Sequence, residues 1–382
     1  MLRKALDQGY LTRQEMETLE GRLEHACQNI PLAQYFMNRI RHSFDRKKRY
    51  YERCYLDKQV LADFELWIDF LHQAYSVGTP MILLATTMPT HILWSDSCPG
   101  RSDGTPGGLG GYSLSGRAWR LQLPPRQQIK MVGFSNNFLE FLAAIINIWV
   151  LLDDNPDITE ATLFALGDNG STVGWLHKAN FAPDTHAAHA TAARKVATLL
   201  RRRQSTLAAE HIEGSRNDVS YLLSREHARC DSFLTSFIRS NQTAQVPSNF
   251  QIKPLSSEII SWVWSVLAFE PTTSLGEPTR QPTSTPASGH AGSISSNRGA
   301  SQETHSCNRC PGPPRCVCSS PPPSFKPSAN GNFQKLVATI FDRARSGKPL
   351  ASWERSSGTV THGTPSVSPH HPTVATGGSL PN

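Results

Sequence analysis

Apolar residues near the start of the chain repeat at the spacing of an amphipathic helix. Thr12 and Glu15 have the spacing of a capping box, and apolar side chains follow at every third or fourth position. The same spacing returns after Pro31, a residue suited to the first turn of a helix. It returns again in a third segment that ends before Gly78. This pattern predicts an all-helical segment at the start of the chain.

After Pro89 the pattern changes to short segments separated by turn residues, followed by segments with helical spacing. The predicted order of elements is three strands, a long helix, a strand, two helices, a strand and a short helix. Such an order predicts an α/β fold, with a mixed sheet flanked by helices. The predicted strands are "HILWSDS" (91–97), "GGLGGYSLSG" (107–116), "AWRLQLP" (118–124), "ATLFALG" (161–167) and "LAAEHIEG" (207–214).

The composition changes at about Phe269, where Pro, Ser, Thr and Gly become dominant and apolar residues become scarce. A segment of this kind cannot bury enough apolar surface to offset the entropy lost on ordering. A short stretch with helical spacing at 330–347 indicates an isolated helix or a partner-docking motif. The predicted organisation is a helical segment (1–58), an α/β domain with leading and trailing helices (59–265) and a mostly disordered tail (266–382).

The charge of the chain is compatible with a nucleic-acid partner. The formal net charge is +7 and the isoelectric point is near 9.0. Residues 39–58 alternate basic side chains with tyrosines, and Arg201, Arg202 and Arg203 end a predicted helix. Two interpretations remain open at this stage: these clusters contact a phosphate backbone, or they form the solvated face of a helix.

The sequence has no signal peptide, and its longest apolar run, at 141–152, is shorter than the roughly 20 residues of a membrane span. We therefore expect a buried helix there, no membrane association, and an intracellular location in the cytoplasm or nucleus. Four of the eight cysteines are crowded near the end of the chain, a pattern typical of a reducing compartment. These four could form a zinc site: Cys307, Cys310, Cys316 and Cys318.

Three carboxylates occupy equivalent places in the predicted order of elements. Asp96 lies at the end of the first strand, Glu140 in the first turn of the long helix, and Asp168 at the end of the fourth strand. Each carboxylate taken alone could instead be a helix cap or a solvated side chain. Asp168 or Asn169, for example, would also suit the N-cap of the next helix. Their joint occurrence at positions that a sheet brings together predicts a metal centre.

The motifs around these residues resemble the ribonuclease H-like domain of retroelement reverse transcriptases, especially the gypsy-like and DIRS-like groups. They are "SDS" (95–97), "GG" (110–111), "NNFLEFLAA" (136–144), "DN" (168–169) and "HIEGSRNDVSYLLSR" (211–225). The resemblance implies a ribonuclease H-like fold with a mixed five-stranded sheet.

The helices before this domain are similar to the thumb or connection segment of the same polyproteins. The sequence contains no paired-aspartate polymerase motif of the YxDD type. We therefore expect a C-terminal fragment of such a polyprotein that has no polymerase active site and acts beside a separate polymerase domain.

The resemblance also implies a mechanism, the hydrolysis of RNA in RNA/DNA hybrids with two Mg²⁺ or Mn²⁺ ions. In the family pattern Asp96 bridges both ions, and Glu140 and Asp168 bind the second one. Other positions are expected to contact the nucleic acid, the glycines by letting its backbone approach closely. These positions are Gly110, Gly111, Asn169, Arg201, Arg202 and Arg203.

The sequence departs from the family at the fourth carboxylate. Tyr221 stands at that position, and a phenol, which is neutral at physiological pH, is a poor ligand for Mg²⁺. Asp218, one helical turn earlier, could replace it only if the helix shifts. We therefore expect weak cleavage or none, and we expect Tyr221→Asp to raise the activity. The alternative is a catalytically inactive nucleic-acid-binding or vestigial protein derived from a transposon.

Overall fold

The computed structural model describes residues 1–268 except position 47 and the segments 81–83, 85–87, 102–103, 132–133, 179–186 and 242–245. The tail from residue 269 onward lies outside the described residues, together with the predicted helix at 330–347 and the four crowded cysteines.

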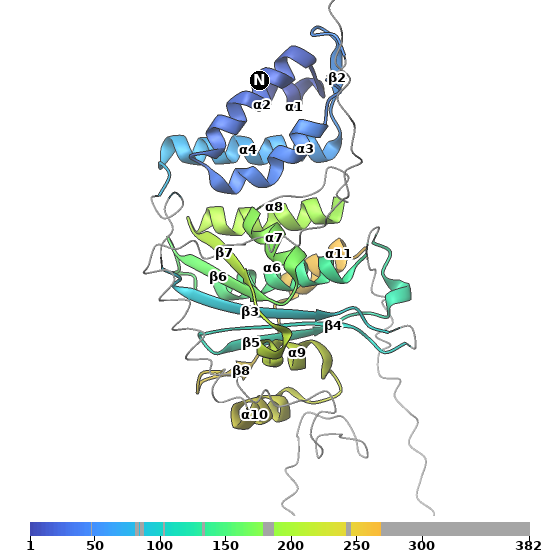
Figure 1. Cartoon of the computed structure of the whole chain (residues 1–382), viewed down its shortest axis with the longest axis vertical. Coiled ribbons are helices and arrows are strands. Elements are labelled where there is room, and N and C mark those ends of the chain that lie inside the picture. Colours follow the sequence, from blue (N-terminus) through green and yellow to red (C-terminus); the bar gives the residue numbers. More distant parts are fainter. Residues whose placement is uncertain are drawn as a thin grey trace, which may run out of the picture. The chain divides into compact units, whose positions relative to one another are not determined.

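A mixed six-stranded sheet forms the centre of the fold, in the order β7-β6-β3-β4-β5-β8 (Figure 1). Strands β3, β4 and β5 form an antiparallel meander, whereas β6 pairs in parallel with β3, and β7 in parallel with β6. The strands are β3 (His91–Cys98), β4 (Gly108–Ser113), β5 (Arg117–Gln122), β6 (Thr162–Gly167), β7 (Thr206–His211) and β8 (Gln251–Ile252). The predicted α/β class is confirmed, and β8 adds a sixth strand to the five expected.

Helices cover both faces of this sheet (Figure 1). On one face α6 packs against the central strands, and α8 packs against α6. On the other face α9 contacts β3 and β4, and α10 contacts β8. The helices of this part are α6 (Asn136–Asp154), α7 (Gly170–Lys178), α8 (Ala187–Arg202), α9 (Asp218–Arg225), α10 (Asp231–Asn241) and α11 (Ser257–Val266), with short 3₁₀ turns η2 (Arg126–Gln128) and η3 (Gly214–Arg216).

The long helix α6 is buried on every side from Phe138 to Leu152. Its length and apolarity would suffice to cross a membrane, yet 83% of its apolar window is buried inside the protein. Asn147 fixes its position: the side chain donates to the carbonyls of Trp94 (2.8 Å) and Tyr112 (3.1 Å). It also accepts a hydrogen bond from the Trp119 indole at 2.9 Å. One buried amide thus links the helix to three strands, and the prediction of a buried helix holds.

The segment before the sheet is mostly helical, and the predicted capping box of Thr12 and Glu15 is present. The prediction of an all-helical segment is wrong in one respect, because this segment also contains two short strands that pair with each other in antiparallel orientation. A strand of three residues leaves no periodic signal in a sequence. The elements are α1 (Leu2–Gln8), β1 (Tyr10–Thr12), α2 (Arg13–Cys27), η1 (Pro31–Phe36), α3 (Met37–His42), β2 (Arg53–Tyr55) and α4 (Lys58–Ser76).

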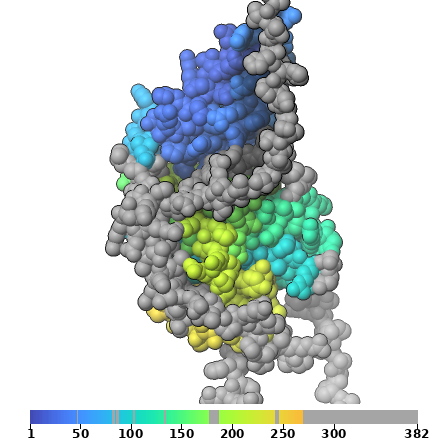
Figure 2. Space-filling view, viewed as in Figure 1, coloured from blue at the N-terminus to red at the C-terminus, as the bar shows by residue number. Residues whose placement is uncertain are grey.

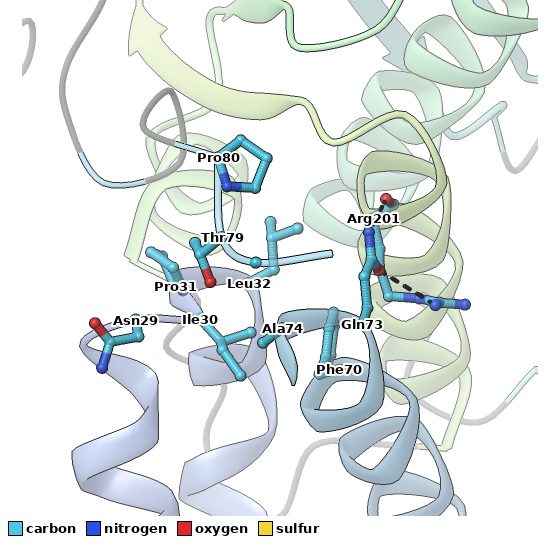
Figure 3. Close-up of a pocket in the computed structure, with 11 residues that line it drawn as sticks. Asn29, Ile30, Pro31, Leu32, Phe70, Gln73, Ala74, Thr79, Pro80 and Arg201 are labelled. Atoms are coloured by element: carbon cyan, nitrogen blue, oxygen red, sulfur yellow. Dashed lines mark hydrogen bonds between the residues drawn. The ribbon is translucent and has the colours of Figure 1, made fainter. Parts of the chain in front are cut away.

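Asp63 joins this first segment to the sheet domain. Its side chain in α4 is fully buried and lies 3.0 Å from Arg39 of α3 and 2.7 Å from Arg194 of α8. Farther along α4, the Gln73 side chain donates to the Arg201 carbonyl at 3.2 Å, beside a small cavity (Figure 3). The two parts of the chain therefore share buried polar contacts as well as one apolar core.

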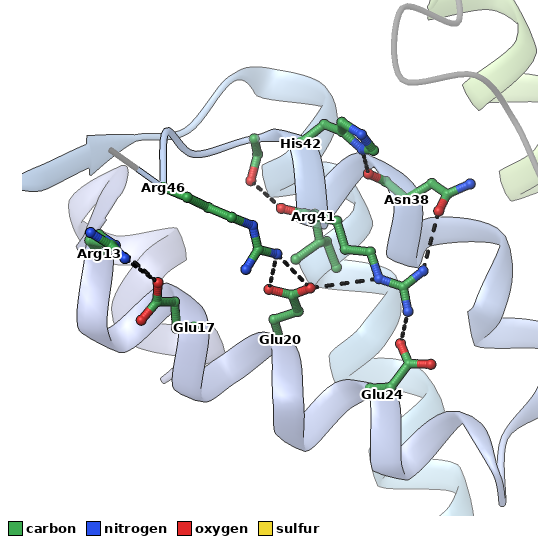
Figure 4. A network of polar contacts seen from close by, with 10 residues as sticks. Arg13, Glu17, Glu20, Glu24, Asn38, Arg41, His42 and Arg46 are labelled. Atoms are coloured by element: carbon green, nitrogen blue, oxygen red, sulfur yellow. Dashed lines mark hydrogen bonds and ion pairs between the residues drawn. The ribbon is translucent and has the colours of Figure 1, made fainter. Parts of the chain in front are cut away.

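Some of the basic residues after α2 pair with acidic side chains of α2 (Figure 4). Arg46 lies 2.7 Å from Glu20, and Arg41 reaches both Glu20 and Glu24 of α2. Part of the positive charge of segment 39–58 is thus neutralised within the fold. This pairing favours the interpretation of that cluster as a solvated helical face.

Candidate metal centre

Three carboxylates from distant parts of the chain meet at one edge of the sheet. Asp96 lies in β3, Glu140 in the first turn of α6, and Asp168 directly after β6. Carboxylate oxygens of the three residues lie within 4.8 Å of one another. Because β3 and β6 are parallel neighbours, their carboxyl ends reach the same edge. Asp96 is 2% exposed and Glu140 4% exposed, so the group sits at the margin of the core.

Asn169, rather than Asp168, caps the helix that follows β6. Its side-chain oxygen accepts hydrogen bonds from the backbone N–H groups of Ser171 (3.0 Å) and Thr172 (3.1 Å). Its amide nitrogen donates to the side chain of Asn137 at 2.8 Å. Asn169 is therefore the N-cap of α7, since it accepts from two of the N–H groups that the first turn leaves without a partner in the helix. The residue predicted to contact nucleic acid has a structural task, and the adjacent carboxylate is left for the acidic group.

Burial and mutual repulsion raise the pKa of two of these carboxylates, those of Glu140 and Asp96. Burial, together with the negative charges of Asp96 and Asp168, raises the pKa of Glu140 to about 8, although Ser97 N–H donates to it at 3.2 Å. Burial also raises the pKa of Asp96, and the nearby Asp168 adds to this, while Arg225 and Ser224 oppose it. Three clustered carboxylates of this kind favour a bound cation.

The donor set fits a divalent cation with a preference for oxygen. The ligands are all carboxylate oxygens, the type that Mg²⁺ and Mn²⁺ take in proteins. Their separations are small enough for one ion to be shared by all three residues. The side chains therefore suit the kind of ion that the sequence motifs implied.

Arg225 is part of this site, a role that no motif predicted. Its guanidinium lies 2.5 Å from the Asp96 carboxylate and 2.8 Å from the Ser224 hydroxyl, which also donates to Asp96. The same guanidinium lies over the Tyr221 ring, 3.6 Å from its centroid. The only available signal was the final arginine of the motif "SYLLSR", one turn after Tyr221.

Asp218 lies outside the group of three carboxylates. Burial raises the pKa of Asp218 to about 6, and its charge acts on Tyr112, which belongs to the core beneath α9. In this position of α9 the carboxylate does not replace the one missing at position 221. The expectation that Asp218 could act as a ligand therefore requires a shift of α9 that the structure does not contain.

Gly110 and Gly111 lie closely against other parts of the protein. A Cβ atom at Gly110 would lie 2.5 Å from the Cβ of Leu223 in α9. A Cβ atom at Gly111 would lie 3.0 Å from the Asn147 side chain of α6. Both glycines are buried. The packing of α9 and α6 thus accounts for the two glycines, and their contact with a hybrid stays a prediction.

The arginines at the end of α8 lie away from the carboxylates. The Arg203 carbonyl accepts from Glu160 N–H at 2.9 Å, just before β6 begins, whereas Asp168 follows the end of that strand. A six-residue strand spans about 20 Å. Arg201 and Arg203 also bond to Gln73 and to the Leu152 carbonyl. The expectation that Arg201, Arg202 and Arg203 act at the site is thus not supported by their position, although Arg202 is exposed.

Segments far apart in the sequence lie on one surface of the molecule. Figure 2 shows this for the segments around β3 and β4 in cyan and around β7 in yellow-green. Contacts between α9 and both central strands hold this side of the molecule together. The site depends on elements from β3 to α9, and its residues span positions 96 to 225.

No protein-family model and no curated protein matches this chain at a significant level. Solved structures that are similar to part of it include ribonuclease H domains. LC11-RNase H1 in complex with an RNA/DNA hybrid has 16% identity and a TM-score of 0.30, over 36% of this chain and 95% of that chain.

Two more structures of this kind have similar values. RNase H1 from the archaeon Halobacterium salinarum has 16% identity and a TM-score of 0.26, over 36% of this chain and 95% of that chain. The N-terminal RNase H domain from Mycobacterium tuberculosis has 14% identity and a TM-score of 0.27, over 36% of this chain and 91% of that chain. At such values, the case for any activity rests on the side chains of this chain.

Proposed function

We propose that this chain is a retroelement-derived nuclease domain that hydrolyses RNA in RNA/DNA hybrids with a divalent metal ion, Mg²⁺ or Mn²⁺. The observation that carries the proposal is the convergence of Asp96, Glu140 and Asp168, with carboxylate oxygens within 4.8 Å of one another. Burial of such a group costs free energy unless its charges are balanced. A cation held by the three residues would balance the charges of this cluster.

The three carboxylates would hold the cation, which supplies the positive charge that stabilises a phosphodiester during its hydrolysis. Ser97 N–H orients Glu140 through one oxygen, and Ser224 orients Asp96. Glu140, with a pKa of about 8, gives up its proton when it becomes a ligand. These side chains are set in β3, α6 and the end of β6, so the site is rigid before any substrate arrives.

The origin in a retroelement polyprotein, and a polymerase as partner, are supported by the motifs of residues 95–225 and by the thumb-like helices before them. The activity we propose is weak, since Tyr221 stands where a fourth carboxylate would bind metal. The second candidate is an inactive nucleic-acid-binding protein. The ion pair of Arg225 with Asp96 favours this candidate, because that carboxylate already has a cationic partner.

A cleavage assay on a labelled RNA/DNA hybrid tests the proposal with the full chain and Mg²⁺ or Mn²⁺. Wild type should cleave slowly, and Asp96→Asn should cleave no hybrid. Arg225 would pair with a new carboxylate at position 221 and so compete with the metal ion for it. We therefore expect faster cleavage from Tyr221→Asp combined with Arg225→Gln than from Tyr221→Asp alone.

Circular dichroism must show that each variant is folded. Equal cleavage by wild type and Asp96→Asn would mean that the activity comes from a contaminant or another site, and the proposal would fail. Hybrid binding without cleavage, in wild type and in the double variant, would support the inactive candidate instead.

A further inference from the structure

We propose that Arg225 is a built-in cation which takes the place of one metal ion, so that this site binds a single divalent ion rather than two. The inference rests on the proposed function, because it concerns how the same three carboxylates hold metal. It assigns Tyr221 a task as well: the ring positions the guanidinium that replaces the ion.

The geometry of Asp96 limits what else can bind there. In the two-ion arrangement that the motifs imply, this residue would hold both ions, and a free oxygen for each ion would favour this. Here Oδ2 accepts hydrogen bonds from the Arg225 guanidinium at 2.5 Å and from the Ser224 hydroxyl. One oxygen remains for an ion shared with Glu140 and Asp168.

Tyr221 holds the guanidinium in this place. The Cζ atom of Arg225 lies 3.6 Å from the centre of the Tyr221 ring, a cation–π contact. Ser224 fixes the other side, since its hydroxyl accepts from Arg225 at 2.8 Å. A residue that is a poor metal ligand is thus a good platform for arginine. The change at position 221 and the ion pair of Arg225 belong to one arrangement.

The charges agree with this arrangement. A carboxylate at position 221 would add a negative charge and so favour a second ion, whereas a tyrosine removes that charge and Arg225 adds a positive one. The guanidinium is cationic and partly exposed, with 27% of its side chain accessible. A phosphodiester at the site would therefore meet one metal ion and one fixed guanidinium.

Isothermal titration calorimetry of the full chain with MnCl₂ tests the proposal without any assay of activity. Wild type should bind one ion, and Tyr221→Asp combined with Arg225→Gln should bind two. Arg225→Gln alone should bind one ion about tenfold more tightly, because a positive charge next to Asp96 is gone. Arg225→Lys keeps that charge and should bind one ion without such a gain.

Arg239→Ala, which removes an exposed arginine from α10, is the matched control and should behave as wild type. Two ions in wild type, one ion in the double variant, or an unchanged affinity in Arg225→Gln would each overturn the inference while leaving the proposed function intact. Wild type that binds no ion would overturn both. Melting curves identify any variant that is unfolded. If the double variant is unfolded, the stoichiometry of wild type and the affinity of Arg225→Gln relative to Arg225→Lys still decide between one ion and two.

Discussion

Asn169 caps α7 with its side chain, while the carboxylate of the adjacent Asp168 joins Asp96 and Glu140. Of these two neighbouring residues, one caps the helix and the other belongs to the candidate metal centre. The division is possible because Asn169 already satisfies the N–H groups of the first helical turn. The carboxylate can then lie at the sheet edge with the other acids.

Substitution of the two neighbours should separate these tasks. Asn169→Ala should lower the free energy of unfolding by about 1 kcal/mol, the usual effect of losing a helix cap. Asp168→Asn should weaken binding of Mn²⁺ strongly but should not lower stability, since it removes a repulsive charge from the group. Urea denaturation and calorimetry measure the two effects. A loss of stability in Asp168→Asn as large as that in Asn169→Ala would contradict the assignment.

The raised pKa of Glu140 should make the ion-free protein less stable as the pH rises. Between the ordinary value of 4.5 and the folded-state value of about 8, the folded protein holds this proton more tightly than the unfolded chain does. The contribution of Glu140 to stability is therefore complete below pH 4.5, and it is lost as the pH approaches 8.

Glu140→Gln should remove this dependence and stabilise the ion-free protein at pH 8 to 9, by an amount on the order of a few kcal/mol. The measurement is thermal unfolding in EDTA across this pH range. Addition of Mn²⁺ should stabilise wild type and leave the variant nearly unchanged. If the stability of the variant depends on pH in the same way as that of wild type, the raised pKa of Glu140 is not the cause of the pH dependence.

Gly110→Ala should displace α9 from the sheet. The added Cβ would lie 2.5 Å from the Leu223 Cβ and 2.7 Å from its backbone, so the helix must move. We expect a loss of roughly 1–3 kcal/mol in stability, as for other overpacked cores. Because α9 carries Arg225, ion affinity should change in the same variant. Gly174→Ala in α7 is the control: nothing lies within 4 Å of its Cβ, and it should be neutral or slightly stabilising.

Asp63→Ala should be among the most destabilising changes in the first segment. It leaves Arg39 and Arg194 half-buried without the carboxylate that both contact, and such losses cost roughly 3–5 kcal/mol. Asp69→Ala is the matched control from the same helix, because its carboxylate is exposed and lies 3.6 Å from Arg201. Equal melting temperatures for the two variants would show that the buried contacts of Asp63 do not stabilise the fold.

Local patterns in the sequence were enough to predict the α/β class, the five main strands, the buried α6 and the capping box at Thr12. Each of these follows from periodicity or from residues within one turn, and such short-range effects are written directly in the chain. The motifs also indicated which carboxylates to compare. The sequence pattern did not predict the two-residue strand β8 or the ribbon of β1 and β2. These strands are too short to show a period, and they form only by pairing with residues far along the chain.

The tertiary structure decided how the residues around the carboxylates are used. Gly110 and Gly111 looked like positions of approach for a ligand, but helices α9 and α6 fill the space beside them. Arg225 had no assigned role, and the fold places it against Asp96, 129 positions earlier in the chain. Contacts of this kind depend on packing of whole helices against the sheet, which no local pattern encodes. The sequence by itself determined the helices and main strands and the three acidic residues. Packing of α9 against the sheet decided that the charge of Arg225 faces Asp96.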